Sequence, residues 1–236
     1  MTDELQDRRH RHRRRWRGLA FAALLVPATA FASPRVLMFP ERTPIGDTVI
    51  YSVSPVDRIA MAQVLLRADE LAREGPLGNI KVGRRVYLTD GGWRWKLLSA
   101  GGGGTFGFTR PISDIVDDAV VLNRANIARD EIRGHSGIGG RRTLSGTIAH
   151  ERAHIAARQR YGAIALVITP AWLREGLSDV IAQESSLSAA DVMKLEETGT
   201  RHPALLYYHG RRRVADELAQ AGGDVDKMMA RHGVRR

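Results

Sequence analysis

The sequence predicts an α+β fold in which a small N-terminal mixed sheet with one covering helix packs on a mainly helical C-terminal lobe. Before residue 125, short segments rich in β-branched and aromatic residues are separated by glycine, proline and aspartate. After residue 143, apolar residues instead recur at helical spacing, and the segments end at glycines. With 43% hydrophobic residues, the chain can bury one compact core shared by two lobes, residues 33–142 and 143–236.

The first 32 residues have the three parts of a secretory signal peptide. Seven arginines lie between Arg8 and Arg17, an apolar run follows from Leu19, and the segment ends in Ala30-Phe31-Ala32. The pattern predicts an exported protein, periplasmic or secreted. Retention of the segment as an uncleaved membrane anchor is the alternative.

The charge distribution and the lack of cysteine exclude some functions and some means of stabilisation. Seven arginines against three carboxylates in the first 32 residues account for +4 of the formal net charge of +10, which leaves about +6 on the rest. The remaining arginines are mostly scattered, so the sequence does not indicate nucleic-acid binding. The chain has no cysteine, so no disulfide can stabilise it after export.

The first lobe is expected to begin with strands at Arg35–Phe39 and Thr48–Val53. A helix should then run over Pro55–Glu74, because Ser54 and Pro55 suit its first positions and apolar residues follow at three- and four-residue steps. Gly75 and Pro76 should stop this helix.

A β-hairpin and two short strands are predicted next. Asn79–Leu88 and Trp93–Leu98 alternate in the manner of strands, and Thr89-Asp90-Gly91-Gly92 between them suits a tight turn. Thr105–Thr109 and Ala119–Leu122 are predicted as further short strands.

The second lobe should contain two helices that matter for function. After a Gly-rich loop over Asn126–Gly140, a helix is expected from near Thr143 or Ser145 to Tyr161. Ala163–Ile168 is apolar and too short for a helix of its own, so it is predicted as a buried link. A further helix should start at Pro170 with Thr169 as its N-cap, and a short one is expected at Asp191–Glu197.

His150, Glu151 and His154 form an H-E-x-x-H motif inside the first of these helices. Residues four apart lie on the same helix face, so both imidazoles can reach one metal ion. Glu151 lies about 100° round the helix from His150, where its carboxylate can reach a metal-bound water without being a ligand. Five residues in this pattern also occur by accident, which makes a third ligand the deciding feature.

Glu175 is the candidate third ligand. It lies on the second turn of the next predicted helix, with twenty residues (155–174) between it and His154. Catalytic zinc usually has three protein ligands and keeps a fourth position for water, so two histidines and one glutamate satisfy the count. The sequence therefore predicts a Zn²⁺ site formed by His150, His154 and Glu175.

These segments resemble the gluzincin clan of metallopeptidases. W-L-R-E-G around Glu175 is similar to the W-L-x-E-G of the aminopeptidase N family, and E-G-L-S-D is similar to the E-x-x-S-D of the thermolysin family. The resemblance implies a zincin-like fold, with His150, His154 and Glu175 as zinc ligands and Glu151 as general base. It also implies that Asp179 holds the other ring nitrogen of the first histidine. The distance in sequence between His154 and Glu175 is slightly longer than is usual for the clan.

Two further expectations come from the same resemblance. The sheet of a gluzincin has an edge strand that binds extended substrate, and Ala119–Asn123 is the candidate. Tyr207-Tyr208-His209-Gly210 resembles the Y-x-x-G that precedes a helix in aminopeptidase N relatives, which makes Tyr207 the expected donor to the oxyanion. Tyr208 or His209 could fill that role, and either tyrosine could instead anchor the last helix in the core.

The sequence thus predicts an exported zinc metallopeptidase that acts on a peptide or protein. The absence of a G-x-M-E-N-like segment before the helix with the two histidines favours an endopeptidase or a narrow-specificity processing enzyme over an aminopeptidase. The alternative is a non-catalytic envelope-associated binding or scaffold protein with a structural or vestigial zinc site. Glu151 argues against that alternative, because a structural site has no use for a general base.

Overall fold

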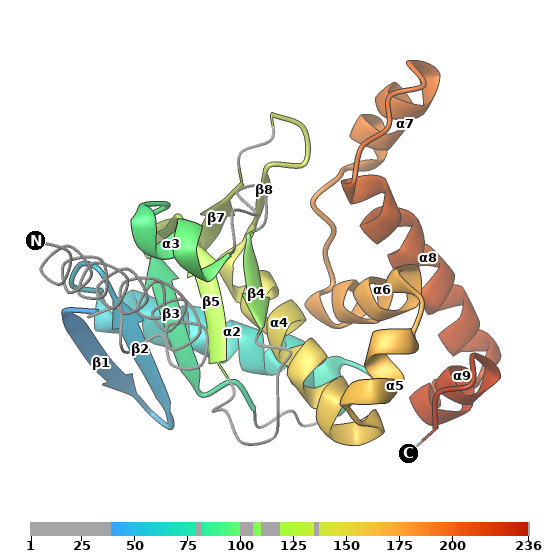
Figure 1. Ribbon diagram of the computed structural model, residues 1–236, viewed down its shortest axis with the longest axis horizontal. Helices are drawn as coiled ribbons and strands as arrows, with labels where there is room; N and C mark the ends of the chain where they lie inside the picture. The colour runs from blue at the N-terminus through green and yellow to red at the C-terminus, as the bar shows by residue number, and fades with distance from the viewer. Residues whose placement is uncertain (1–38, 79–81, 100–105, 110–118, 135–136, 236) are drawn as a thin grey trace, which may run out of the picture.

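The structure is a computed structural model that describes residues 39–78, 82–99, 106–109, 119–134 and 137–235. It is a mixed α+β protein, as predicted, with a small mixed sheet on one side and helices on the other (Figure 1). The predicted signal peptide and the predicted strand at residues 35–38 lie outside the described residues. None of the described helices is both long and apolar enough to cross a membrane.

The main sheet has five strands in the order β1-β2-β3-β5-β4. β1 and β2 form an antiparallel hairpin, β2, β3 and β5 are mutually parallel neighbours, and β4 pairs antiparallel with β5. The strands are β1 Glu41–Ile45, β2 Thr48–Ser52, β3 Arg85–Thr89, β4 Gly107–Thr109 and β5 Ala119–Asn123.

Both faces of the sheet are covered. Alternate residues such as Val86, Val120 and Leu122 pack under α2 (Arg58–Glu74) and the helix that follows residue 143. The opposite face, with Tyr87 and Val121, packs against α3 (Trp93–Leu98). Since successive residues of a strand point to opposite faces, all five residues of β5 are buried.

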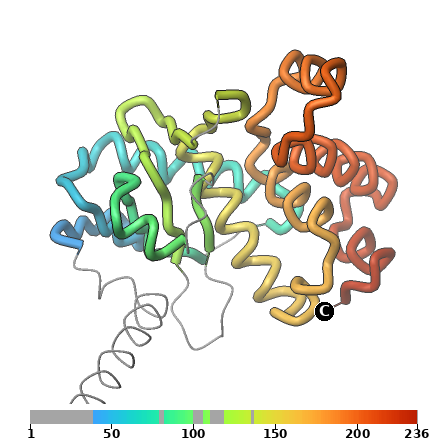
Figure 2. Tube along the Cα trace, turned by 45° about the horizontal axis from the view of Figure 1, so that its top comes forward, coloured from blue at the N-terminus to red at the C-terminus, as the bar shows by residue number. Residues whose placement is uncertain are grey.

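A second, three-stranded sheet leads into the helical half. Its strands are β6 Ala125–Asn126, β7 Glu131–Arg133 and β8 Arg141–Thr143, and the 3₁₀ helix η2 Ile127–Arg129 lies between the first two. The helices that follow are α4 Leu144–Tyr161, α5 Ala163–Ile168, α6 Ala171–Ala182, α7 Ala189–Glu197, α8 Ala204–Gln220 and α9 Val225–Arg231. α4 runs between the sheet and the remaining helices, so it belongs to both halves of the core (Figure 2).

Several local predictions are confirmed. α2 is the expected covering helix, although it begins three residues late because Asp57, and not Ser54, caps it. α4 begins after Thr143 and ends before Gly162, as expected. α7 covers the predicted Asp191–Glu197 and starts with a full capping box at Ser188.

Others are wrong. Trp93–Leu98 is a helix and not the second strand of a hairpin, because β3 pairs in parallel with β2 and β5 on its two sides and leaves no place for an antiparallel neighbour. In this helix Trp95 is buried and Trp93 is exposed. The predicted loop over Asn126–Gly140 contains the second residue of β6 and all of η2 and β7.

The predicted substrate strand is not at the edge of the sheet. Ala119–Asn123 is β5, which has β3 on one side and β4 on the other, so its backbone hydrogen bonds are already made. β4 takes the edge position instead. Pairing partners far away in the sequence decide which strand is outermost, and a single strand's composition does not show them.

The link between α4 and α6 also differs from the prediction. Ala163–Ile168 forms the short helix α5, and Ile164, Val167 and Ile168 are largely exposed while Leu166 is buried. Thr169 is not the N-cap of α6, because its hydroxyl donates back to the carbonyl of Ala165, and Pro170 occupies the cap position.

Candidate metal centre

Two residues, Thr143 and Asp130, hold the first turn of α4, which precedes the H-E-x-x-H motif. Thr143 caps the helix by accepting from the Gly146 N–H at 3.0 Å. Asp130, in a left-handed backbone conformation at the end of η2, accepts from the backbone N–H and the hydroxyl of Ser145 at 2.7 and 2.6 Å. These contacts satisfy N–H groups that the first helical turn leaves without partners, so the rotation of α4 is set from its first residues.

His150, His154 and Glu175 come together as predicted. The two Nε2 atoms are 3.1 Å apart, and Glu175 Oε2 lies 3.4 Å from the first and 3.2 Å from the second. A tetrahedral zinc ion with ligand bonds of about 2.0–2.1 Å holds its ligand atoms about 3.3 Å from one another. The three side chains therefore fit a zinc ion, and they are the group of possible metal ligands found among the described residues.

The hydrogen bonds behind the histidines set their tautomers. Asp179 Oδ1 lies 2.7 Å from Nδ1 of His150, so that nitrogen carries the proton. Ser178 Oγ donates to the carbonyl of Arg174, and so it accepts from Nδ1 of His154 at 3.2 Å. Both Nε2 atoms then present lone pairs to each other at 3.1 Å, an arrangement that only a cation between them makes favourable.

The pKa shifts in the cluster also favour a positive charge on His150 and a negative charge on Glu175. Burial lowers the pKa of His150, but hydrogen bonds with Asp179 and Glu175 raise it to about 9. Burial raises the pKa of Glu175, but the hydrogen bonds from the two histidines hold it below its usual range. A proton can serve as the cation between these groups, so a metal ion bound here would compete with protonation.

Arg142 lies behind the possible metal ligands, where it contacts Asp179 and Glu184. It is 9% exposed, and its Nη2 donates to Asp179 Oδ1 at 2.8 Å while its Nε donates to Glu184 at 3.1 Å. Burial opposes ionisation of Asp179, but Arg142 and His150 keep its pKa low. Asp179 thus stays an acceptor for His150. Sequence reasoning found Asp179 but missed Arg142 and Glu184, because these pairs join positions 37 and 42 residues apart.

Glu151 lies beside the three ligands and makes none of the contacts that join them. It is 6% exposed, and burial raises its pKa above the usual value, although the charges of His150 and His154 act in the opposite direction. A Cβ built on Gly107 of β4 would lie 3.4 Å from Glu151 Oε1. The missing side chain at Gly107 therefore leaves room between the edge strand and this carboxylate.

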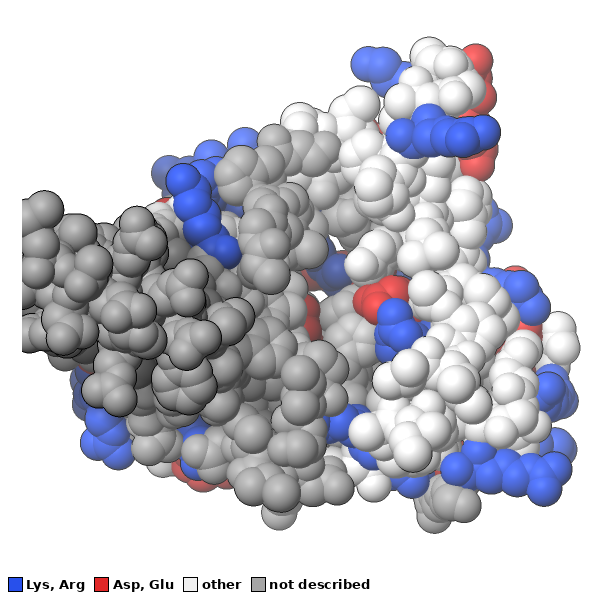
Figure 3. Space-filling view, viewed as in Figure 1, with Lys and Arg blue, Asp and Glu red and all other residues white. Residues whose placement is uncertain are grey.

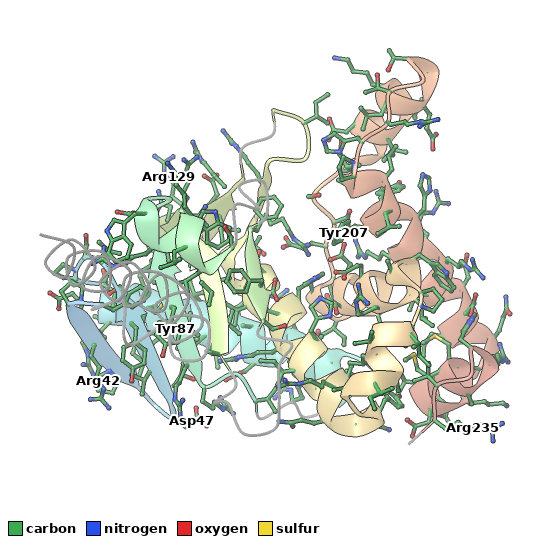
Figure 4. The ribbon with its side chains drawn as sticks, viewed as in Figure 1. Arg42, Asp47, Tyr87, Arg129, Tyr207 and Arg235 are labelled. Carbon is green, nitrogen blue, oxygen red and sulfur yellow. The ribbon has the colours of Figure 1, made fainter. Side chains whose placement is uncertain are left out.

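Tyr207 reaches the site because α6 and α8 touch. A Cβ on Gly176 would lie 2.4 Å from the carbonyl oxygen of Gly210, so the two helices meet backbone to backbone at these glycines. Gly176 follows Glu175, and Gly210 lies one turn after Tyr207, which brings the Tyr207 and His150 rings to 6.3 Å. Figure 4 shows Tyr207 on the side of α8 that faces the sheet.

The other two candidate oxyanion donors lie elsewhere. Tyr208 packs in a separate apolar cluster with Leu187 and Leu195 of the α7 region. His209 is 52% exposed and pairs with Glu196 on α7. Tyr207 lies within the first turns of α8 and not before the helix, as the Y-x-x-G resemblance had suggested.

A cleft of about 990 Å³ connects these residues. It is lined by all three ligands together with Glu151 and Tyr207, and the edge strand β4 forms part of its wall. The hollow opens between the sheet and the C-terminal helices, with acidic and basic side chains in its wall (Figure 3). A cleft of this size accommodates several residues of an extended peptide.

The chain was compared with protein-family models, with curated proteins and with solved structures, and none of them matches it.

Proposed function

We propose that the protein is an exported zinc-dependent metallopeptidase of the gluzincin type, with a zincin-like arrangement of α4 and α6. One observation carries the proposal: the lone pairs of His150, His154 and Glu175 converge on one point, and a buried carboxylate outside that ligand set lies beside it in an open cleft. A purely structural zinc site is closed by a fourth protein ligand, whereas hydrolysis requires an open position.

His150, His154 and Glu175 would hold the zinc ion. When bound, zinc lowers the pKa of a coordinated water towards neutrality and polarises a substrate carbonyl. Asp179, itself held by Arg142, keeps His150 in the tautomer that the metal needs.

Glu151 would act as the general base. Its pKa is raised by burial, which brings a carboxylate closer to the proton affinity required of a base near neutral pH. It accepts a proton from the attacking water and passes it to the nitrogen of the leaving amine.

Tyr207 would donate to the oxyanion that develops on the scissile carbonyl. Burial and the neighbouring charges of Glu175 and Glu151 raise its pKa, so the phenol stays protonated and able to donate. β4 would align the substrate backbone by β-addition, since it lines the cleft and stands at the edge of the described sheet.

The first test is the zinc content of the purified chain beside a His154→Ala control. About one zinc ion per chain, lost in the control, together with peptide hydrolysis that a chelator abolishes, is the expected result. Zinc without any hydrolysis across a broad peptide panel would support the scaffold alternative. A folded protein that binds no zinc in the presence of excess zinc would refute the metal site itself.

A further inference from the structure

Of the three arginines that line the cleft, two have no part in the proposed catalytic steps. Arg158 is on α4 and Arg174 is on α6. His150, His154 and Arg158 are spaced four residues apart, so they form one line along α4, with Arg158 one turn beyond the second histidine. Arg158 is therefore placed about 6 Å further along the helix axis than His154.

Arg174 is held close to the metal ligands. Its Nε donates to Glu175 Oε1 at 3.2 Å, while the other oxygen of Glu175 faces the histidines. Its Nη1 lies 3.3 Å from the carbonyl oxygen of Leu166 on α5. Among the described residues its Nη2 has no hydrogen-bond partner, and the side chain is 33% exposed. The guanidinium is thus fixed in place with donors left over, which lowers the entropic cost of binding an anion.

The charges along the cleft favour an anionic ligand at this end. Arg142, the third arginine of the wall, pairs with two carboxylates, those of Asp179 and Glu184, which leaves one negative charge in that group. The carboxylates of Glu151 and Glu175 equal Arg158 and Arg174 in number, so a bound divalent metal ion would make the whole set net positive. Beside the two arginines, α5 contributes an apolar wall that includes Leu166 and Val167.

We propose that Arg158 and Arg174 form a carboxylate-recognition subsite, so that the enzyme prefers peptides with a carboxylate and an adjacent apolar group at the α5 end of the cleft. This inference rests on the proposed function, because it names the substrate class of the same site. The carboxylate has two possible sources, the C-terminus of a peptide or an Asp or Glu side chain next to the scissile bond.

The test compares two small ligands that differ in one carboxylate. 2-Benzylsuccinate carries one carboxylate for the metal and a second for the arginines, and 4-phenylbutanoate is the same molecule without one of them. Calorimetry on the zinc-loaded protein should show at least a roughly tenfold tighter binding of the dicarboxylate, since a charge-assisted bidentate contact is worth at least that factor. The measurement needs no turnover.

Substitutions then test whether the two arginines cause the preference for the dicarboxylate. Arg158→Gln and Arg174→Gln should each reduce the affinity ratio to about three or less, and Arg174→Lys should retain part of it. Arg73→Gln, an exposed arginine on α2 outside the cleft, is the matched control and should leave the ratio unchanged. Equal binding of the two ligands by the wild-type protein, or a ratio that persists in the Arg158→Gln/Arg174→Gln double variant, overturns the proposal.

Peptide pairs separate the two sources and separate this proposal from the proposed function. Cleavage of free-terminus peptides alone assigns the subsite to the C-terminal carboxylate, and cleavage of end-blocked peptides at Asp or Glu assigns it to the side chain. Equal cleavage of an end-blocked peptide without acidic residues contradicts the subsite alone. A protein that shows the affinity ratio and hydrolyses no peptide contradicts the proposed function alone.

Discussion

Replacing Gly176 by alanine should reduce activity far more than it reduces stability. The added Cβ would lie 2.4 Å from the carbonyl oxygen of Gly210 and 2.5 Å from its carbonyl carbon. Both atoms belong to the backbone, so no side-chain rotation relieves the contact. The helices α6 and α8 must then separate by roughly 1 Å before a methyl group fits at ordinary van der Waals distance.

The two effects of this separation have different sizes. Overpacking costs about 1–3 kcal/mol, and the better helix propensity of alanine returns about 1 kcal/mol, so the net loss of stability should be about 0–2 kcal/mol. Tyr207 sits on α8 and Glu175 on α6, so the same shift moves the proposed oxyanion donor relative to the proposed metal ligand. A displacement of this size can cost about a hundredfold in kcat/KM.

The assay is chelator-sensitive peptide hydrolysis, measured together with zinc content and urea unfolding for each protein. Gly137→Ala is the control, because Gly137 has no atom within 4 Å of its added Cβ and does not need a left-handed backbone. It should match the wild type in all three measurements. A Gly176→Ala protein with wild-type kcat/KM would show that the α6–α8 contact does not position Tyr207.

Three further predictions concern individual side chains. Glu151→Gln should keep the zinc ion and lose nearly all hydrolysis, which metal analysis and an activity assay on the same sample will check; unchanged turnover would remove Glu151 from the mechanism. Asp179→Asn should weaken zinc affinity by roughly ten- to a hundredfold in a competition titration with a chelator, and an unaltered affinity would contradict its role behind His150. Glu217 concerns pH: burial opposes its ionisation, but hydrogen bonds from His232 and Arg213 lower its pKa in the folded state. Its stabilising contribution should therefore be complete above the unfolded pKa of about 4.3 and disappear as pH falls through the lower folded value. The difference in melting temperature between wild type and Glu217→Gln should shrink from pH 6 to pH 2, and a constant difference would show that the carboxylate charge is not involved.

Local rules determined the parts of the site that lie within one helix. His150 and His154 share a face of α4 because four residues nearly complete one turn, whatever the rest of the chain does. The ends of α4 and α7 were equally predictable, because Thr143, Gly162 and Ser188 are capping residues that act on backbone groups only a few positions away.

Tertiary structure decided what depends on neighbours distant in the sequence. Trp93–Leu98 has too few residues to show a period, so its packing against the sheet, and not its own pattern, makes it a helix. β4 is the edge strand because β5 has a partner strand on both sides. The same holds within the site: Arg142 meets Asp179 across 37 positions, and Gly176 meets Gly210 where α6 crosses α8. The sequence by itself determined that the two histidines share one helix face, since the helical repeat is a property of the backbone. It also contained the other candidate residues of the site. Only the packing of α4, α6 and α8 brought Glu175, Asp179 and Tyr207 around the two histidines, because a contact between two helices depends on the side chains of both.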